Sequence, residues 1–226
     1  MTGMDLIVRQ FGFCDYQATY DDMRRFNEHR QPDTEDEIWC LEHPSVYTLG
    51  LGGHQKHIIS PGSIPVIRVD RGGQVTYHGP GQLIVYCLLD LHRRSLAIKN
   101  FVNLLEQSVI DMLFEQGLKA VRRPGAPGVY VNNRKIAALG IRVRRGCTYH
   151  GLALNVDMDL FPFRGINPCG YSDLQVTCLR DLGIEVNVNQ ATELLLLHLY
   201  QHLDATEVTL AGKMKKSISN TCMATC

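Results

Sequence analysis

The amino-acid sequence predicts one mixed α/β domain. Strand-like and helical hydrophobic patterns follow one another along its 226 residues without the regular strand–helix–strand units of a parallel α/β fold, and no internal repeat or linker separates them. Hydrophobic residues make up 45% of the chain, which suffices for a core and exceeds what disordered chains contain. We expect the domain to span residues 1–204, and residues 205–226 to form a polar, mobile tail.

The first half of the domain is predicted to be mostly extended. A helix is expected over residues 15–29, where four large apolar side chains recur near helical spacing. Residues 50–65 hold four glycines and two prolines and are predicted to form a loop. Residues 82–91 are an almost unbroken apolar run, which indicates a buried strand. Short strands are predicted at residues 6–8, 38–42, 45–49 and 66–69.

The second half combines helices with strands. A helix is predicted over residues 98–116, because its apolar residues share one face and Gly117 then caps its end. A hairpin is predicted from residues 128–131 and 134–143, since the two asparagines between them tolerate the positive φ of a tight turn. Residues 148–156 are expected to form a further strand, and residues 193–203 a late helix.

Charged residues balance overall but not locally. The chain has 23 Lys+Arg and 23 Asp+Glu, so it lacks the basic excess of a general nucleic-acid binder, and we expect no nucleic-acid partner. Between Glu115 and Asp157, however, no acidic residue occurs, and this stretch is either a solvated face or a surface for a polyanionic or acidic partner. Nucleic acid and an acidic carrier protein both qualify, although few aromatic residues interleave for a single-stranded nucleic acid. The stretch contains Lys119, Arg122, Arg123, Arg134, Lys135, Arg142, Arg144 and Arg145.

The cysteines and the hydropathy pattern point to a reducing compartment. Eight cysteines are present, but no CxxC pair of the kind used by zinc ribbons or thioredoxin-like proteins occurs. The first residues lack the apolar stretch of an export signal, and no run of about 18 apolar residues predicts a membrane span. We therefore expect a cytoplasmic protein with no membrane partner and with mostly free thiols.

The densest cluster of functional residue types lies at residues 71–82. Four glycines in these twelve residues let the backbone approach a ligand closely, because no Cβ intrudes. Arg71 can supply a charge, and Tyr77 and His78 can supply hydrogen bonds. A tight turn into the following strand is the structural alternative. Neither GxxxxGK[ST] nor GxGxxG occurs, so this is not a nucleotide-phosphate loop.

Two further segments carry reactive side chains. Lys135 follows the hairpin turn at the start of an apolar strand, where desolvation would favour a neutral amine that acts as a general base. Cys169 lies on a stiff loop, after a proline and before a glycine, near basic charge that favours the thiolate. The residues alone leave a buried, inert Cys169 equally open. His54 and His57 are a weak metal pair in a polar loop, and we expect no metal site.

Five sequence blocks, taken in order, resemble a known family. The first is Arg71-Gly72-Gly73-x-x-Thr76-Tyr77-His78-Gly79-Pro80-Gly81-Gln82. The later blocks are Gly128-Val129-Tyr130, Lys135-Ile136-Ala137, Gly151-Leu152-Ala153-Leu154-Asn155 and Asn167-Pro168-Cys169-Gly170. Together they resemble the lipoyl(octanoyl) transferases, also called octanoyl-carrier-protein:protein octanoyltransferases, over residues 5–182. Long motifs in the correct order are far more specific than any single glycine pattern.

The resemblance implies a fold similar to the catalytic domain of biotin and lipoate–protein ligases, and an acyltransferase activity. Such enzymes move an octanoyl or lipoyl group from the thioester of an acyl carrier protein to a lysine of lipoyl domains. These acceptors belong to 2-oxoacid dehydrogenases and to the glycine-cleavage H protein, and the transfer is the first step of endogenous protein lipoylation.

The same resemblance assigns roles to individual residues. Cys169 matches the family's acyl-accepting cysteine and Lys135 its general acid/base. Ala138 stands where such proteins often have serine, which removes a hydroxyl contact but not the backbone ones. The segments that contact substrate match Arg71, Gly72, Gly73, Gln74, Val75, Thr76, Tyr77, His78, Ala138, Leu139, Gly140, Gly151, Leu152 and Ala153.

Elementary chemistry agrees with this implication. A thioester is an activated acyl donor and an amide is a stable product, so the transfer needs no cofactor, neither ATP nor a metal. We expect Lys135 to take the Cys169 proton, the sulfur to accept the acyl group, and an acceptor lysine to remove it. Arg142, Arg144 and Arg145, with Arg122 and Arg123, would steer acidic carriers to the site.

Three alternatives remain open from the sequence. An ATP-dependent lipoate–protein ligase would share the fold and the lysine, and its need for ATP would distinguish it. A hydrolase would use Cys169 with His78 or His150 and transfer the acyl group to water. A non-catalytic protein that binds acyl carrier proteins would need neither Cys169 nor Lys135.

Overall fold

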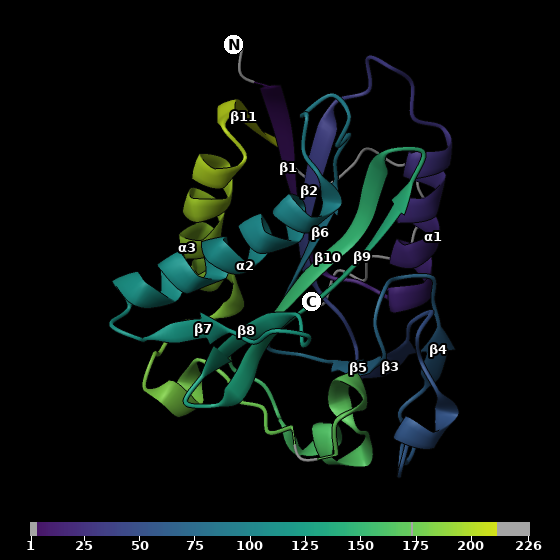
Figure 1. Cartoon of the computed structure of the whole chain (residues 1–226), viewed down its shortest axis with the longest axis vertical. Helices are drawn as coiled ribbons and strands as arrows, with labels where there is room; N and C mark the ends of the chain where they lie inside the picture. Colours follow the sequence, from purple (N-terminus) through teal and green to yellow (C-terminus); the bar gives the residue numbers. More distant parts are fainter. Residues whose placement is uncertain (1–3, 173, 212–226) are drawn as a thin grey trace.

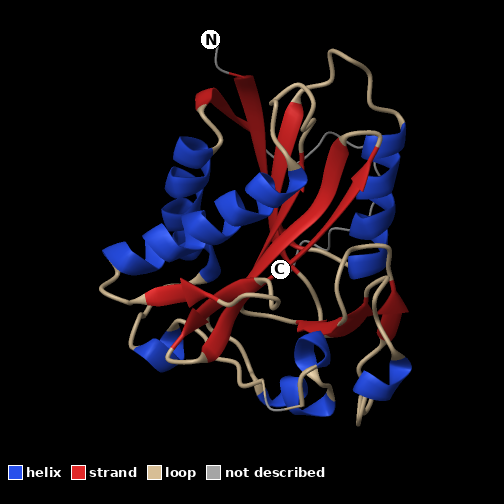
Figure 2. Ribbon diagram, in the orientation of Figure 1, coloured by secondary structure: helices blue, strands red, loops and turns tan. Residues whose placement is uncertain are grey.

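The computed structural model describes residues 4–172 and 174–211. A mixed eight-stranded sheet forms the centre of this part of the chain, with helices on both faces and a small three-stranded sheet at one end (Figures 1 and 2). The predicted class, a single mixed α/β domain, is confirmed. Of the helices in this part of the chain, none has the length and apolarity that crossing a bilayer requires.

The central sheet has the strand order β11-β1-β2-β6-β10-β9-β8-β7. Its β11-β1 and β1-β2 pairs are parallel, whereas the pairs from β2 to β7 are antiparallel. The strands are β1 (Met4–Phe13), β2 (Asp36–Glu42), β6 (Gln82–Leu88), β7 (Ala120–Arg122), β8 (Gly128–Val131), β9 (Arg134–Arg144), β10 (Cys147–Asn155) and β11 (Ala205–Ala211).

Successive side chains along the buried strands point to opposite faces of the sheet, so they pack in two separate cores. Helices α2 (Ile98–Glu115) and α3 (Val188–His202) cover one face, against residues such as Leu83 and Val85. Helix α1 (Tyr16–Glu28) covers the other, where Ile84 and Tyr86 point (Figure 1). The predicted apolar run is therefore a strand buried on both faces, which explains its lack of polar alternation.

The small sheet and four 3₁₀ helices close one end of the molecule. The sheet has the order β4-β3-β5, with β3 (Val46–Leu49), β4 (Val66–Arg68) and β5 (Val75–His78). The 3₁₀ helices are η1 (Gln55–His57), η2 (Phe161–Gly165), η3 (Pro168–Gly170) and η4 (Arg180–Leu182). A third apolar cluster, which includes Tyr47, Tyr77 and Phe163, joins this sheet to η2.

The predicted domain boundary at residue 204 is wrong. Residues Ala205–Ala211 form β11, which pairs in parallel with β1 at the edge of the sheet. Ala205 and Val208 pack against the main core, while Leu210 is exposed. The strand is short and lies at the edge of the sheet, directly before the polar residues of the expected tail, so the sequence did not separate it from them. The remainder of the expected tail, from residue 212 onward, lies outside the described residues.

Other element predictions are confirmed with shifted bounds. The hairpin between β8 and β9 turns at Asn132 and Asn133, whose φ values of 48° and 64° are those the prediction required. Helix α3 begins at Val188 rather than at residue 193, because Asn187 and Gln190 form a capping box with two hydrogen bonds of 2.9 Å. Strands β5 and β7 were not predicted; the glycines around β5 and the shortness of β7 conceal them.

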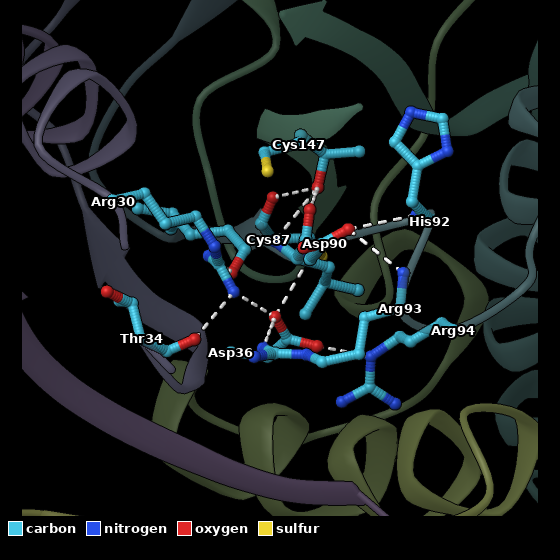
Figure 3. A network of polar contacts seen from close by, with 12 residues as sticks. Arg30, Thr34, Asp36, Cys87, Asp90, His92, Arg93, Arg94 and Cys147 are labelled. Carbon is cyan, nitrogen blue, oxygen red and sulfur yellow. Dashed lines mark hydrogen bonds and ion pairs between the residues drawn. The ribbon is translucent and has the colours of Figure 1, made fainter. Parts of the chain in front are cut away.

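A charged network fastens the end of the central sheet opposite the small sheet (Figure 3). The carboxylate of Asp36, fully buried at the start of β2, accepts hydrogen bonds from Arg30, Arg93 and Arg94 and from the backbone N–H of Asp90. Arg30 also donates to the backbone oxygen of Leu88 at 3.0 Å. The network therefore ties the α1–β2 connection to the end of β6 with ionic hydrogen bonds.

Candidate active site

A narrow cavity lies between the small sheet and the central sheet. The glycine-rich segment before β5, the middles of β9 and β10, and the first turn of α1 form its walls. Twelve of the residues predicted to contact substrate line it: Arg71, Gly73, Gln74, Val75, Thr76, His78, Ala138, Leu139, Gly140, Gly151, Leu152 and Ala153. The three segments thus meet at one place, and their contact with substrate stays a prediction.

The other two predicted contact residues, Gly72 and Tyr77, support the walls from behind. The N–H of Gly72 donates to the carbonyl of Ile141 at 2.9 Å, which ties the glycine-rich segment to β9. Tyr77 is buried edge-on against Phe163, with ring centroids 5.4 Å apart, and its hydroxyl lies 2.9 Å from that of Ser45. Neither residue lines the cavity.

Two glycines allow this close approach of backbones. A Cβ on Gly140 would lie 3.0 Å from the carbonyl oxygen of Gly72 and 3.1 Å from Cδ of Arg71. A Cβ on Gly151 would lie 2.1 Å from the carbonyl oxygen of Val85, which no relaxation of a buried strand accommodates. Gly140 and Gly151 therefore shape the cavity wall from β9 and β10, outside the glycine-rich segment that the sequence singled out.

Arg71 holds the glycine-rich segment in its folded shape. Its buried guanidinium donates to the backbone carbonyls of Thr48, Gly72 and Gln74 at 2.7 to 2.9 Å. It also donates to the hydroxyl of Thr48 at 2.8 Å. These bonds join β3 to the cavity wall, so Arg71 fixes the loop as well as lining the cavity.

Neutral polar groups close one end of the cavity. His78 Nδ1 donates to Gln82 Oε1 at 2.8 Å, and His43 Nε2 lies 2.8 Å from the hydroxyl of Tyr86. Burial lowers the pKa of His78 to about 3, helped by the nearby charge of Arg71, and burial lowers the pKa of His43 to about 4. Both imidazoles are therefore uncharged at neutral pH.

A carboxylate cluster beside the cavity escaped the sequence analysis. The hydroxyls of Tyr20 and Tyr149 both donate to Asp70, and Nε2 of His150 lies 3.4 Å from the same carboxylate. Burial raises the pKa of Asp70, but these hydrogen bonds outweigh it and hold the pKa well below its usual range. His150 lines the cavity in a left-handed backbone conformation with φ of 60°. The residues of this cluster lie far apart in the sequence, so no sequence motif links them.

Lys135 lies on β9, buried and outside the cavity lining. Its Nζ donates to the carbonyl of Pro127 at 2.9 Å and stands 5.3 Å from the ring centroid of Tyr130. A Cβ on Gly128 would lie 2.8 Å from Cε of Lys135, so glycine at that position makes room for the lysine. The amine is buried, which the sequence left open, and its catalytic role stays a prediction.

A buried relay connects the cavity to the strand of Lys135. Gln82, which accepts from His78, donates to Asn155 Oδ1 at 2.9 Å, and Asn155 Nδ2 donates to the carbonyl of Thr177 at 2.9 Å. The N–H of Thr177 in turn donates to the carbonyl of Lys135 at 2.9 Å. Every side chain of the relay makes these bonds without a net charge.

Cys169 lies in η3, and its side chain is outside the described part of the structure. The backbone of η3 turns sharply, with the N–H of Gly170 donating to the carbonyl of Asn167 at 2.9 Å. Gly170 has a φ of 83°, and a Cβ there would lie 3.5 Å from Cγ of Gln74, a cavity residue. The turn that carries Cys169 therefore adjoins one edge of the cavity.

The basic stretch is less positive in the fold than in the sequence. Its missing counter-charges come from distant elements: Arg122 pairs with Glu106 at 3.0 Å, and Arg144 with Glu28 at 2.7 Å. Arg142 lies 3.9 Å from the carboxylate of Asp70. Steering of acidic partners by this stretch stays a prediction, and it rests on fewer net charges than the sequence suggested.

Other cysteines and histidines do not assemble into a second centre. Cys40, Cys87, Cys147 and Cys178 are free and buried, and burial raises the pKa of Cys87 to about 12. Cys14 is disulfide-bonded, so the expectation of free thiols does not extend to it. His54 and His57 have ring centroids 6.3 Å apart, and within the described ranges no three His, Cys, Asp or Glu residues lie together as metal ligands.

Comparisons with known proteins agree with this geometry. Residues 16–200 match the family of the lipoyl protein ligase A/B catalytic domain. An octanoyltransferase of Dechloromonas aromatica is 53% identical over 201 residues, which cover 89% of this chain and 98% of that protein.

Solved structures with lower identity share the fold. A bipartite lipoate protein ligase of Thermoplasma acidophilum superposes with a TM-score of 0.71 at 18% identity, covering 96% of this chain and 89% of the other. The biotin protein ligase of Aquifex aeolicus superposes with a TM-score of 0.54 at 14% identity, covering 88% and 70%. The chain therefore belongs to the family of the lipoyl protein ligase A/B catalytic domain and, within it, to the octanoyltransferases.

Proposed function

We propose that the chain transfers an octanoyl group from the thioester of an acyl carrier protein to a lysine of lipoyl domains. Cys169 holds the acyl group between the two steps, and Lys135 is the general acid/base. One observation carries the proposal: the cavity is built from the three predicted contact segments, and its residue Gln74 adjoins the turn of Cys169. Apolar and glycine residues on its β9 and β10 walls suit an alkyl chain.

The first step forms the acyl-enzyme. Lys135 takes the thiol proton of Cys169, and the thiolate attacks the carbonyl carbon of the donor. The tetrahedral intermediate collapses, the carbon–sulfur bond to the carrier breaks, and the carrier thiolate takes the proton back from Lys135. The free carrier leaves, and the octanoyl chain stays in the cavity as a thioester of Cys169.

The second step forms the amide. The neutral amine of the acceptor lysine attacks the Cys169 thioester. Lys135 then removes a proton from the amine nitrogen, which is now bonded to the carbonyl carbon. Collapse of the intermediate expels the thiolate of Cys169, which regains a proton from Lys135. The uncharged histidines add no ionic charge at their end of the cavity, and Arg71, a charged residue of the lining, has its guanidinium hydrogen-bonded to the loop backbone.

The chemistry determines what else the reaction requires. Because a thioester is already activated, the proposed reaction uses neither ATP nor a metal ion. The donor is an acidic carrier protein, and the acceptors are the lipoyl domains of 2-oxoacid dehydrogenases and the glycine-cleavage H protein. We place the reaction in the cytoplasm, where the thiol of Cys169 would stay reduced; the disulfide-bonded Cys14 departs from this expectation.

A transfer assay on an isolated lipoyl domain tests the proposal. Octanoyl carrier protein without ATP is compared with free octanoate plus ATP and Mg²⁺, and the intact mass of the lipoyl domain is measured. We expect a gain of about 126 Da in the first reaction, from one octanoyl group joined to a lysine nucleophile. A domain whose acceptor lysine is replaced by arginine should gain nothing. Modification only with ATP indicates a ligase, and release of octanoate without modification indicates a hydrolase; either result contradicts the proposal.

A further inference from the structure

From its sequence context, His57 is interpreted as a solvated loop residue. In the structure its backbone is hydrogen-bonded to the segment that leads into the turn of Cys169. Its carbonyl accepts the N–H of Asn167 at 2.8 Å, and the next residue, Ile58, forms a β-bridge with Ile166. The N–H groups of Ile59 and Ser60 both donate to the carbonyl of Gly165, at 2.8 and 3.0 Å. The backbone of η1 is therefore held in register with η2 and η3.

The placement of the His57 ring fits one tautomer. Its Nδ1 lies 3.5 Å from Nδ2 of Asn167, and an amide nitrogen can only donate. In the tautomer that suits this contact, Nδ1 accepts and Nε2 carries the proton. That Nε2 lies 3.6 Å from the place that a Cβ on Gly170 would occupy, beside the side chain of Gln74. A hydrogen-bond donor thus stands where the cavity edge meets the turn of Cys169.

The other histidines near the cavity are placed differently. His43 uses one ring nitrogen on the carbonyl of Cys14 and the other on Tyr86, and His78 uses its two on Gln82 and Thr48. Both are buried and already use their ring nitrogens on these partners, whereas His57 is half-buried beside the turn of Cys169. Of these three rings, that of His57 stands next to the turn where the thioester forms.

We propose that His57 is a catalytic residue whose Nε2–H stabilises the oxyanion of both acyl-transfer steps. The inference rests on the proposed function and deepens it. When the thiolate of Cys169 attacks the donor, the carbon–sulfur bond forms and the carbonyl electron pair moves to oxygen. Nε2–H donates a hydrogen bond to that oxygen and keeps its proton. The pair returns as the carrier thiolate leaves, and Lys135 supplies the proton to that thiolate.

Single-turnover acylation measures this contribution directly. Excess octanoyl carrier protein is mixed rapidly with enzyme, and the acyl-enzyme is followed by quenched intact mass. His57→Phe keeps a planar ring and removes the donor, and we expect acylation to slow about 100-fold, as when an oxyanion donor is lost elsewhere. His57→Gln retains an N–H donor on a side chain of similar reach and should stay within about tenfold of the wild-type rate.

Controls separate this role from loop packing. His54→Phe changes an exposed histidine of the same loop and should acylate at the wild-type rate. The half-saturating donor concentration should stay unchanged in His57→Phe, because the hydrogen bond strengthens only when the oxyanion forms. If the phenyl ring prevents folding, judged by thermal unfolding, His57→Leu removes the same donor with a smaller side chain.

Two results would overturn the inference. Acylation of His57→Phe or His57→Leu within about twofold of wild type would show that no donor acts there. Equal slowing in His57→Gln and His57→Phe would show that the ring only packs. If the wild-type protein itself forms no acyl-enzyme, the proposed function fails first, so the two failures are distinguishable.

Discussion

The two ends of the central sheet satisfy their buried polar groups differently, by ion pairs at one end and by neutral hydrogen bonds at the other. Where β2 begins, Asp36 gathers three arginines into a buried ionic network that no cavity residue joins (Figure 3). Where β6 begins and β10 ends, Gln82 and Asn155 continue a chain of neutral hydrogen bonds from His78.

This difference teaches where the fold can tolerate charge. Buried ions are stable only when every charge is paired, so an ionic network suits an end of the sheet that does not change. A cavity that receives an alkyl chain and a thioester gains from walls whose buried polar groups are hydrogen-bonded, as the uncharged His78 and the guanidinium of Arg71 are here. Lys135 and the turn of Cys169 lie at the neutral end, where proton transfer can occur without disturbing a charged network.

Removing the centre of the ionic end should produce the largest effect on stability. In Asp36→Ala, three arginines lose their shared carboxylate, and we expect the free energy of unfolding to fall by about 3–5 kcal/mol. Urea denaturation measures this change. Glu28→Ala, which breaks an exposed pair with Arg144, is the matched control and should leave the free energy of unfolding almost unchanged. Equal losses in the two variants would contradict the contrast between the ends.

Changing the reactive end should affect rate. Lys135→Ala removes the proposed general base, and we expect kcat to fall about 100-fold or more. Lys119→Ala, an exposed lysine of the same basic stretch, should leave kcat unchanged. Steady-state transfer to a lipoyl domain measures both variants. A Lys135→Ala protein that folds and retains normal kcat would remove the lysine from the mechanism.

Lowering the pH should reduce the free energy of unfolding through two buried histidines at the neutral end of the sheet. His78 and His43 have folded pKa values of about 3 and about 4, below the 6.5 of an unperturbed histidine. Between these values the unfolded chain binds protons that the folded chain does not. Their contribution to stability is therefore complete above pH 6.5 and declines as pH falls toward 4, by up to about 1.4 kcal/mol per pH unit for each histidine.

Urea unfolding at pH 7, 6 and 5 checks this dependence. His78→Gln has one buried imidazole fewer, so its stability should decline less steeply than that of the wild-type protein over this range. Parallel declines would mean that the His78 imidazole is not the source of the acid sensitivity.

The smallest expected effect concerns the basic stretch. Arg144 already pairs with Glu28, so replacing Arg144 and Arg145 by glutamine removes little free positive potential. We expect the KM for the carrier donor to rise less than about threefold and the salt dependence of the rate to weaken slightly. A rise above about tenfold, with unchanged kcat, would restore the stretch as a principal docking surface.

Sequence reasoning succeeded where the physical signal is local. The apolar run of β6, the asparagine turn before β9 and the glycine-rich segment each carry their own pattern. It failed where partners come from far along the chain. Asp70 is surrounded by residues from α1, β9 and β10, and the counter-charge of Arg122 comes from Glu106 on α2.

Two further misses have physical reasons. Residues Ala205–Ala211 join the sheet only because the edge of β1 needs hydrogen-bond partners, a demand that their own composition does not show. His57 contacts Asn167, the N-cap residue of η3, which lies 110 positions later in the sequence. Neither spacing nor composition reports such a contact.

The account depends above all on an acyl group carried by Cys169. Purified protein is mixed with octanoyl carrier protein without ATP, and its intact mass is measured before and after hydroxylamine. We predict a gain of about 126 Da from thioester formation, reversed by hydroxylamine and lost in Cys169→Ser but retained in Cys147→Ser, the matched control at a buried free cysteine. An adduct that persists in Cys169→Ser, or transfer to the lipoyl domain with no adduct on the wild-type protein, would contradict the account.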